Sequence, residues 1–220
     1  MHHPLFNIIK NKKLFKQLSK NYGSPTYVYS KSQLIENISS INRALKANFK
    51  KYQICYTIKA NSNPHIIKVL KSEMPSLGAD CSSPGEIYAA KLGGILPNDC
   101  IFTGNYESIE DLKYAYEENT HINLDDINSF HRLKQIGTPR EISFRLNPGF
   151  GKGAFSQVVT GGKNSKFGVP KHKIIDAYKL AKENGVKEFG IQCMTGSGVL
   201  DPNYFPKLME EIIKNIDAIM

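Results

Sequence analysis

The sequence predicts an α/β fold of the TIM-type (β/α)8 barrel kind, with about six βα units present. From Gln53 onward, short apolar runs alternate with longer amphipathic stretches, which is the pattern of repeated βα units. Crossover connections between parallel strands are right-handed, so successive units curl in one direction. Polar residues follow the apolar runs at the same relative place, as they do on the catalytic face of a barrel.

The N-terminal residues predict a separate lead-in to these units. Residues 5–20 have the apolar spacing of one or two short amphipathic helices, and residues 22–29 turn into a short strand. A helix is expected from about Lys31 to Phe49, with Ser30 as its N-cap. We therefore expect residues 1–30 to form a helix and a strand, and residues 31–220 to form the barrel domain.

The repeated units supply the strands and helices of the barrel. Apolar runs rich in β-branched, aromatic and sulfur-bearing residues indicate strands that are covered on both faces. The strands are expected at about residues 53–58, 77–81, 100–103, 121–124, 141–146 and 188–193. Turn and capping residues predict that the helices begin near Pro64, Pro84, Ser108, Asp126, Lys171 and Pro202.

The number of units also predicts that the barrel is truncated. Six βα units do not close an eight-stranded barrel, and they leave two strand edges unpaired. The last helix has an apolar face and reaches Met220 without a C-cap signal. We therefore expect the chain to be an N-terminal fragment of a longer protein.

Composition restricts the compartment and the partners. The chain has 220 residues, of which 40% are hydrophobic, and this suits one large soluble domain. No apolar run approaches the roughly 18 residues of a membrane span. The first four residues lack the apolar region of a signal peptide. We therefore expect a cytoplasmic protein that does not bind membranes.

Charge and cysteine spacing restrict the ligands. The formal net charge is +9, but the lysines are scattered and the densest run is Lys10 to Lys20, so we expect no nucleic-acid binding. The charge does suit anionic small molecules. The four cysteines form no close pair and no metal-binding spacing, which predicts reduced thiols and no metal site.

The first predicted strand ends on Lys59, which is the candidate catalytic residue. Lysine often closes a strand only because its ammonium reaches water, so position alone decides little. Other polar residues end the later strands, and each alone is equally explained as a turn residue or a helix cap. These residues are Asp80, Ser82, Thr103, Asn105, Asp125, Arg145, Asn147, Thr195 and Ser197.

Several segments resemble one enzyme family. Tyr56–Asn61 is similar to the lysine segment of the alanine-racemase-like, or fold-type III, pyridoxal-phosphate enzymes, especially the diaminopimelate decarboxylases and their ornithine decarboxylase relatives. Arg145–Gly149 followed by Gly161–Gly168 resembles the paired signature of diaminopimelate decarboxylases. Further similar segments follow in the same order as in that family, and they are Gly78–Glu86, Phe102–Asn105 and Ile122–Asp125.

The resemblance implies a pyridoxal 5'-phosphate site. It implies that Lys59 carries the cofactor and is desolvated at the strand end, and that Asp80 and Glu86 position or tune this lysine. It places Arg145 near the phenolic oxygen of the cofactor and Ser197 at its phosphate. The missing part would hold a glycine-rich phosphate loop, an acidic partner of the pyridine nitrogen and a C-terminal β domain.

One position departs from the family pattern. The family ends its sixth strand with His-x-His-x-Gly-Ser, and the second histidine stacks on the cofactor ring. This chain has Gln192–Ser197, with Met194 at the stacking position. A thioether can cover a ring by dispersion, but it neither donates a hydrogen bond nor titrates. We therefore expect Met194 to affect reaction control more than cofactor binding.

The function implied by the resemblance is pyridoxal-phosphate-dependent decarboxylation of a cationic or diamino acid. The first substrate is meso-diaminopimelate, giving L-lysine, followed by ornithine or arginine. The family also implies a homodimer for the full-length protein. Three alternatives remain open, and they are an amino-acid racemase, a non-catalytic homologue that binds cofactor or a partner, and a barrel without cofactor.

Overall fold

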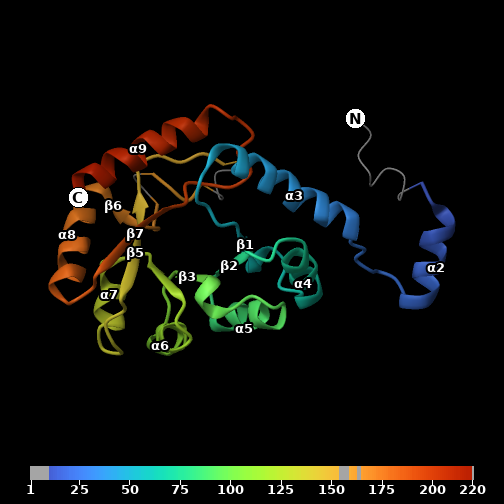
Figure 1. Ribbon diagram of the computed structural model, residues 1–220, viewed down its shortest axis with the longest axis horizontal. Coiled ribbons are helices and arrows are strands. Elements are labelled where there is room, and N and C mark those ends of the chain that lie inside the picture. The colour runs from blue at the N-terminus through green and yellow to red at the C-terminus, as the bar shows by residue number, and fades with distance from the viewer. Residues whose placement is uncertain (1–9, 154–158, 163–164, 220) are drawn as a thin grey trace.

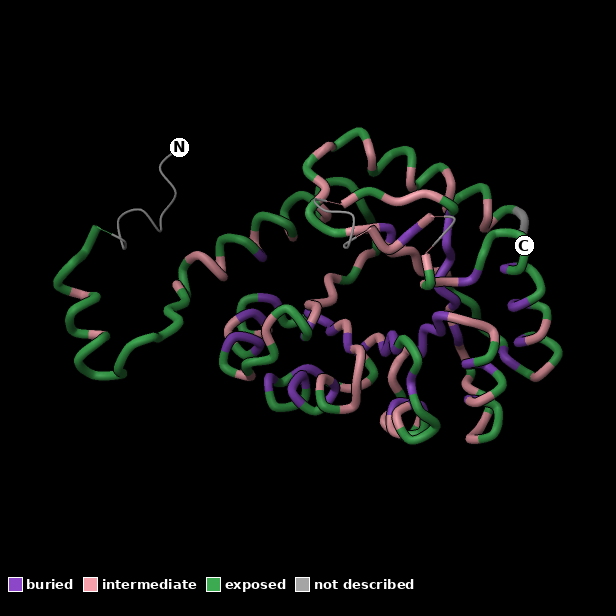
Figure 2. Tube along the Cα trace, turned by 180° about the vertical axis from the view of Figure 1, so that it is seen from behind, coloured by how far each residue is buried: buried purple, intermediate pink, exposed green. Residues whose placement is uncertain are grey.

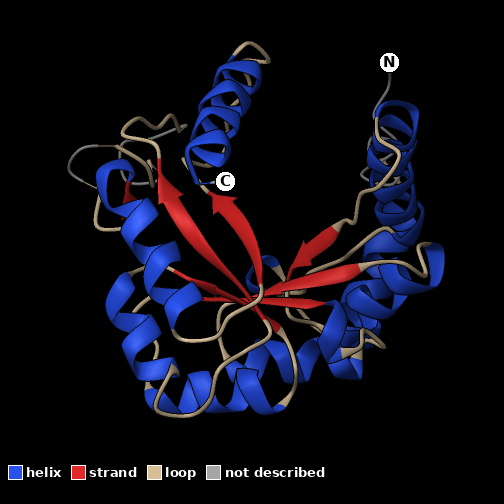
Figure 3. Cartoon of the chain, turned by 60° about the vertical axis from the view of Figure 1, so that its left-hand side comes forward, coloured by secondary structure: helices blue, strands red, loops and turns tan. Residues whose placement is uncertain are grey.

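A curved parallel sheet with helices along its outer side forms the centre of the computed structural model (Figures 1 and 3). The structure describes residues 10–153, 159–162 and 165–219. Every strand pair in these ranges is parallel. Because parallel strands need crossovers, a helix or a long loop separates each strand from the next.

The strands confirm the prediction closely. They are β1 (Cys55–Thr57), β2 (Gly78–Cys81), β3 (Cys100–Gly104), β4 (His121–Leu124), β5 (Glu141–Asn147), β6 (Val169–Pro170) and β7 (Glu188–Cys193). Their order follows the chain from β1 to β5, and both β6 and β7 pair with β5. The two-residue β6 was not predicted, because two residues show no periodicity. Over the described residues the sheet stays open between β1 and β7, so it forms part of a barrel.

The helices after the strands begin where the sequence predicts them. They are α4 (Pro64–Glu73), α5 (Pro84–Leu92), α6 (Ile109–Glu117), α7 (Ile127–Leu133), α8 (Lys171–Glu183) and α9 (Tyr204–Ile219), with short 3-10 turns η1 (Ile58–Ala60) and η2 (Pro97–Asp99). Four of them have a side-chain N-cap that accepts a backbone N–H of the first turn, namely Asn63, Ser83, Ser108 and Asp126.

The N-terminal lead-in follows the prediction only in part. Helices α2 (Lys12–Tyr22) and α3 (Lys31–Asn48) are present, and Ser30 caps α3 by accepting the N–H of Gln33 at 3.3 Å. The predicted strand at residues 22–29 is wrong, because α2 extends to Tyr22 and the following residues pair with no strand among those described. Tyr27 is 90% exposed, and the segment meets the rest of the chain at Tyr29, whose hydroxyl accepts from Asn61 Nδ2 at 2.9 Å; most of the tube between α2 and α3 is coloured as exposed (Figure 2). The predicted helical residues 5–9 lie outside the described residues.

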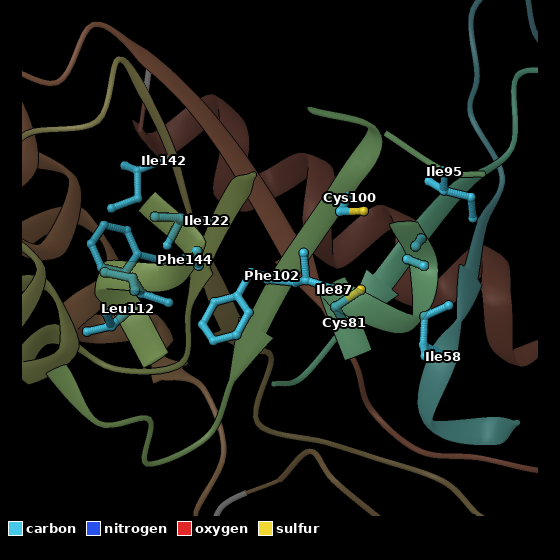
Figure 4. Close-up of a cluster of buried hydrophobic side chains, with 14 of the residues drawn as sticks. Ile58, Cys81, Ile87, Ile95, Cys100, Phe102, Leu112, Ile122, Ile142 and Phe144 are labelled. Atoms are coloured by element: carbon cyan, nitrogen blue, oxygen red, sulfur yellow. The ribbon is translucent and has the colours of Figure 1, made fainter. Parts of the chain in front are cut away.

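The core lies between the sheet and its helices. Alternate residues of β3, β4 and β5 point toward the helices and are fully or almost fully buried (Figure 4). Phe144 of β5 is 0% exposed. The centre of its ring lies 5.2 Å from that of Tyr178 of α8, in an edge-on contact, and 6.3 Å from that of Phe130 of α7. Burial raises the pKa of Tyr178 to about 12, and its hydroxyl donates to the carbonyl of Gly190 at 2.6 Å.

Three findings concern the cysteines, clusters of metal-binding side chains and the length of the apolar helices. The four cysteines are all free. In the described ranges, no cluster of histidine, cysteine or acidic side chains has the arrangement of a metal site. None of the described helices combines the length and the apolar character that a membrane crossing requires.

We predict that Phe144→Ala lowers the free energy of unfolding by about 3–5 kcal/mol, because it leaves a cavity among Tyr178, Phe130 and the sheet. Urea unfolding of the purified chain measures this loss. The matched Phe144→Leu variant keeps most of the apolar volume and should lose markedly less. Equal losses for both variants would contradict a packing role for the ring.

Candidate active site

The face of the sheet turned away from the helices carries a polar ladder across three strands. Thr103, Asn123 and Ser143 occupy matching register positions in β3, β4 and β5. Asn123 Nδ2 donates to Thr103 Oγ1 at 3.5 Å, and Ser143 Oγ donates to Asn123 Oδ1 at 2.7 Å. Asn123 is 1% exposed, so these bonds satisfy groups that water cannot reach. Sequence reasoning noted Thr103 but missed this ladder, although a polar residue inside an apolar strand was its signal.

Arg145 is an enclosed cation at the carboxyl edge of the sheet. Its side chain is 6% exposed. Nη1 donates to Asp125 Oδ1 at 3.2 Å, while Nη2 donates to the carbonyls of Met194 at 3.1 Å and Thr160 at 3.4 Å. The guanidinium carbon lies 4.8 Å from the centre of the Phe167 ring. These contacts hold the guanidinium in one orientation.

Asp125 is the carboxylate that pairs with Arg145. Its Oδ2 accepts the backbone N–H of Gly168 at 3.2 Å, so both of its oxygens are engaged. Burial raises the pKa of Asp125, while the Gly168 N–H and the Arg145 charge act in the opposite direction. Burial likewise lowers the pKa of Arg145, and Asp125 opposes that shift. Each charge offsets part of the desolvation cost of the other.

Asn147 closes the base of the long connection after β5. Its Nδ2 donates to the carbonyl of Gly162 at 3.0 Å, and its Oδ1 accepts the N–H groups of Gly149 and Gly162, both at 3.0 Å. The connection also needs a residue without a side chain at Gly151, where its backbone passes the residues that follow β7. A Cβ added to Gly151 would lie 2.6 Å from the carbonyl oxygens of Gly161 and Thr195, so the backbones approach too closely for any side chain.

Lys59 lies in the η1 turn directly after β1, at the same carboxyl edge. This turn packs against β2, which carries Asp80, and against α5, which carries Glu86. Lys59 itself is exposed in the described structure, and the desolvated amine that the resemblance implies for the full-length protein stays a prediction. An exposed amine at this edge is accessible to a small molecule.

Asp80 and Glu86 have local structural partners. Asp80 Oδ2 accepts a hydrogen bond from Thr57 Oγ1 at 3.3 Å, which links β2 to the end of β1. Glu86 Oε2 accepts the backbone N–H of Ser82 at 2.7 Å, in the first turn of α5. A carboxylate at a helix N-terminus is stabilised by the helix dipole. Glu86 therefore stabilises the start of α5, in addition to the role at Lys59 that the resemblance implies.

The segment after β7 joins Arg145 through its backbone. The Met194 carbonyl accepts from Arg145 and also from Thr160 Oγ1 at 3.0 Å. Ser197 is exposed and lies between two glycines with positive φ, Gly196 at 157° and Gly198 at 69°. The contacts of the described residues therefore unite Arg145 with Met194, whereas Lys59 and Ser197 share only the carboxyl edge of the sheet with them.

These groups suit a small anionic ligand with a reactive carbonyl. The edge offers an exposed primary amine on Lys59, a buried guanidinium on Arg145 and a hydroxyl flanked by glycines at Ser197. In addition, Gln192 Oε1 is buried without a hydrogen-bond partner among the described residues, in register with Arg145 on β5. An unsatisfied buried acceptor at this position is a candidate partner for a donor of a bound molecule.

Comparison with known proteins agrees with this chemistry. Residues 34–220 match the family described as "Pyridoxal-dependent decarboxylase, pyridoxal binding domain". The chain is 37% identical to a diaminopimelate decarboxylase of Thermoplasma acidophilum, over 84% of this chain and 44% of that protein. It is 35% identical to a diaminopimelate decarboxylase of Methanothermobacter thermautotrophicus, over 90% of this chain and 46% of that protein. The chain thus spans about half the length of the curated relatives it matches.

Solved structures confirm the predicted fold class. The crystal structure of a Helicobacter pylori diaminopimelate decarboxylase complexed with L-lysine superposes with a TM-score of 0.82 at 27% identity, over 93% of this chain and 52% of that one. A Paramecium bursaria Chlorella virus arginine decarboxylase has a TM-score of 0.75 at 18% identity, over 94% of this chain and 54% of that one. At that identity the second likeness supports the fold alone.

We predict that Asn147→Ala lowers the free energy of unfolding by about 2–3 kcal/mol, because it removes three hydrogen bonds worth about 1 kcal/mol each. Chemical denaturation measures the change. The control is Asn98→Ala on the exposed η2 turn, which should stay within about 0.5 kcal/mol of the parent. If both variants behave alike, the Asn147 side chain does not hold the connection.

Proposed function

We propose that this chain, which belongs to the pyridoxal-dependent decarboxylases through their pyridoxal-binding domain, serves the decarboxylation of meso-diaminopimelate to L-lysine. Two curated relatives with this name are 37% and 35% identical to the chain. A structural neighbour of the same name was solved with L-lysine bound. Since the chain spans about half of each relative, the activity is that of the whole protein.

The observation that carries the proposal is the placement of Lys59. It lies inside the matched range, on an exposed turn at the carboxyl end of β1. A parallel barrel collects its chemistry at that end. The amine must be exposed to react with the carbonyl of a cofactor. Because the η1 turn packs against β2 and α5, the backbone position of Lys59 is fixed.

The remaining residues fit pyridoxal phosphate. Lys59 would hold its carbonyl carbon, Arg145 would face its phenolic oxygen and Ser197 would bind its phosphate. Asp80 and Glu86 would position Lys59 through the strand end and the helix turn that they stabilise. The buried Gln192 acceptor is consistent with a ligand that completes this edge. When bound, the cofactor supplies an electron sink for the carbanion left by loss of carbon dioxide.

The chain's own residues fix the position of a positive charge and keep the lysine accessible to a substrate. Arg145 keeps a positive charge at a fixed place, because its pairing with Asp125 and two carbonyls leaves the guanidinium little freedom. Lys59 stays accessible, so a substrate amine can reach the position that the lysine amine occupies. Met194 provides apolar contact but no proton, so proton control falls to other groups.

The wider properties proposed for the whole protein follow its relatives. We place residues 31–220 in the cofactor-binding barrel domain and residues 1–30 in a lead-in. A homodimer and a cytoplasmic location suit a biosynthetic enzyme of this family. Ornithine and arginine are the next substrates to test, because Tyr56–Asn61 also resembles the lysine segment of the ornithine decarboxylase relatives.

The first test concerns the lysine. We expect borohydride reduction of the full-length protein with pyridoxal phosphate to label the peptide that contains Lys59, and Lys59→Ala to abolish the label. Lys166→Ala is the control, since this exposed lysine lies over the Phe167 ring at 5.0 Å on the same edge. It should leave the labelling unchanged. Label on Lys166, or on Lys163 outside the described residues, would show the site assignment to be wrong.

The second test concerns Met194. We expect Met194→His to raise the decarboxylation rate of the full-length protein about tenfold, because a histidine can move a proton at this position. The pH profile should then gain a titration at about pH 6.5, the ordinary pKa of a histidine side chain. An unchanged or lower rate with the cofactor still bound would argue for a methionine-specific mechanism or a different task.

A further inference from the structure

We propose that Asp125 is a positioning residue that locks Arg145 and the Phe167–Gly168 turn into one unit at the carboxyl edge of the sheet. Its importance for cofactor binding rests on the proposed function. The lock itself is a property of this chain alone. Asp125 follows β4, Arg145 lies in β5, and the turn closes the long connection before β6.

The two oxygens of Asp125 serve two different segments. Oδ1 accepts from Arg145 Nη1 at 3.2 Å, and Oδ2 accepts from the N–H of Gly168 at 3.2 Å. The side chain is 6% exposed, so water does not replace either donor. A carboxylate with both oxygens committed in a buried site can rotate only by breaking a charge-assisted bond.

Arg145 connects this carboxylate to the rest of the edge. Its second amino group donates to the carbonyls of Thr160 and Met194, and its plane lies against the Phe167 ring. Thr160 and Phe167 belong to the long connection, whereas Met194 follows β7. One guanidinium therefore joins three segments, and Asp125 supplies the opposite charge that keeps it in place.

The turn has a backbone geometry that strongly favours glycine. Gly168 has a φ of +80°, and a Cβ there would lie 3.0 Å from the N of Asn147 and 3.1 Å from the carbonyl oxygen of Arg145. The turn thus lies directly against the backbone of β5. Its N–H points at Asp125, so the carboxylate determines how the turn and Arg145 meet.

The variant that separates charge from shape is Asp125→Asn. An asparagine has one acceptor oxygen and one donor amide, so its NH2 must face either Arg145 or the Gly168 N–H. One of the two contacts becomes a donor facing a donor. The matched control is Asp126→Asn, the neighbouring carboxylate that caps α7 by accepting the N–H of Ser129 at 2.8 Å. Asparagine caps helices as well as aspartate, so this control removes one charge without opening a contact to Arg145.

Two readouts need no cofactor. The first is modification by phenylglyoxal with peptide mapping, using Arg140 as internal reference because its side chain is 81% exposed against 6% for Arg145. We expect Asp125→Asn to raise the labelling rate of Arg145 relative to Arg140 about tenfold. The second is hydrogen exchange at the Gly168 amide, which should accelerate by a similar factor of about ten. Asp126→Asn should change neither.

A third readout connects the lock to cofactor binding. In the full-length protein, Asp125→Asn should weaken the equilibrium binding of pyridoxal phosphate about tenfold, measured by the absorbance of the bound form. If Lys59 is never labelled, the proposed function fails, yet the arginine and amide readouts still test the lock. If Lys59 is labelled but binding is unchanged in Asp125→Asn, the cofactor part of this inference is overturned.

The folded state decides how the result is interpreted. If Asp125→Asn keeps the circular dichroism of the parent while Arg145 labelling and Gly168 exchange stay unchanged, the lock is overturned. If the variant does not fold, the parent protein decides the question. Its Gly168 amide should exchange at least about tenfold more slowly than the amide of the exposed Lys166, and equal rates would overturn the proposal.

Discussion

Burial of a guanidinium imposes the strictest constraint on this protein. A charge at the edge of an apolar sheet is costly unless opposite charge and acceptors surround it. Arg145 meets that requirement with a carboxylate, two backbone carbonyls and an aromatic ring. These partners come from the end of β4, the connection after β5 and the residues after β7. The demands of one side chain therefore fix the relative position of segments that are distant in sequence.

The sheet can present such a charge because its two faces differ in chemistry. In β5, Ile142, Phe144 and Leu146 face the helices, while Ser143 and Arg145 alternate with them on the opposite face. The first set drives packing through burial of apolar surface. In the second set, Ser143 donates to Asn123 of β4 in matching register, whereas the partners of Arg145 lie beyond the strand ends. A slip of one residue would exchange the two sets, so the register of the core also determines the position of the site.

The sequence predicts the frame of the molecule well, because each element has a local signal. Apolar runs mark the six longer strands, and capping residues such as Ser108 and Asp126 mark the helix starts. The family resemblance identified Arg145 and Asn147, but it gave no partners for them. Several of those partners are backbone groups of Thr160, Gly162 and Met194, whose positions follow from loop conformation and have no residue pattern. The expected strand at residues 22–29 failed for a related reason, since a strand needs a neighbour and the described chain provides none.

At Met194 the structural contacts are made by the main chain, whereas the chemical character of the position depends on the side chain. In this structure the contacts of residue 194 to Arg145 and Thr160 are made by its carbonyl oxygen, which every amino acid possesses. Exchange of the histidine typical of the resembled family for methionine thus removes a titratable group while the main-chain acceptor remains. The guanidinium keeps its orientation because it depends on backbone and on Asp125. A protein built this way can exchange a titratable side chain for one that does not titrate at residue 194 without rebuilding the edge of the sheet. Positions whose structural role is carried by the main chain are therefore the ones at which an active site of this kind can change its chemistry at least structural cost.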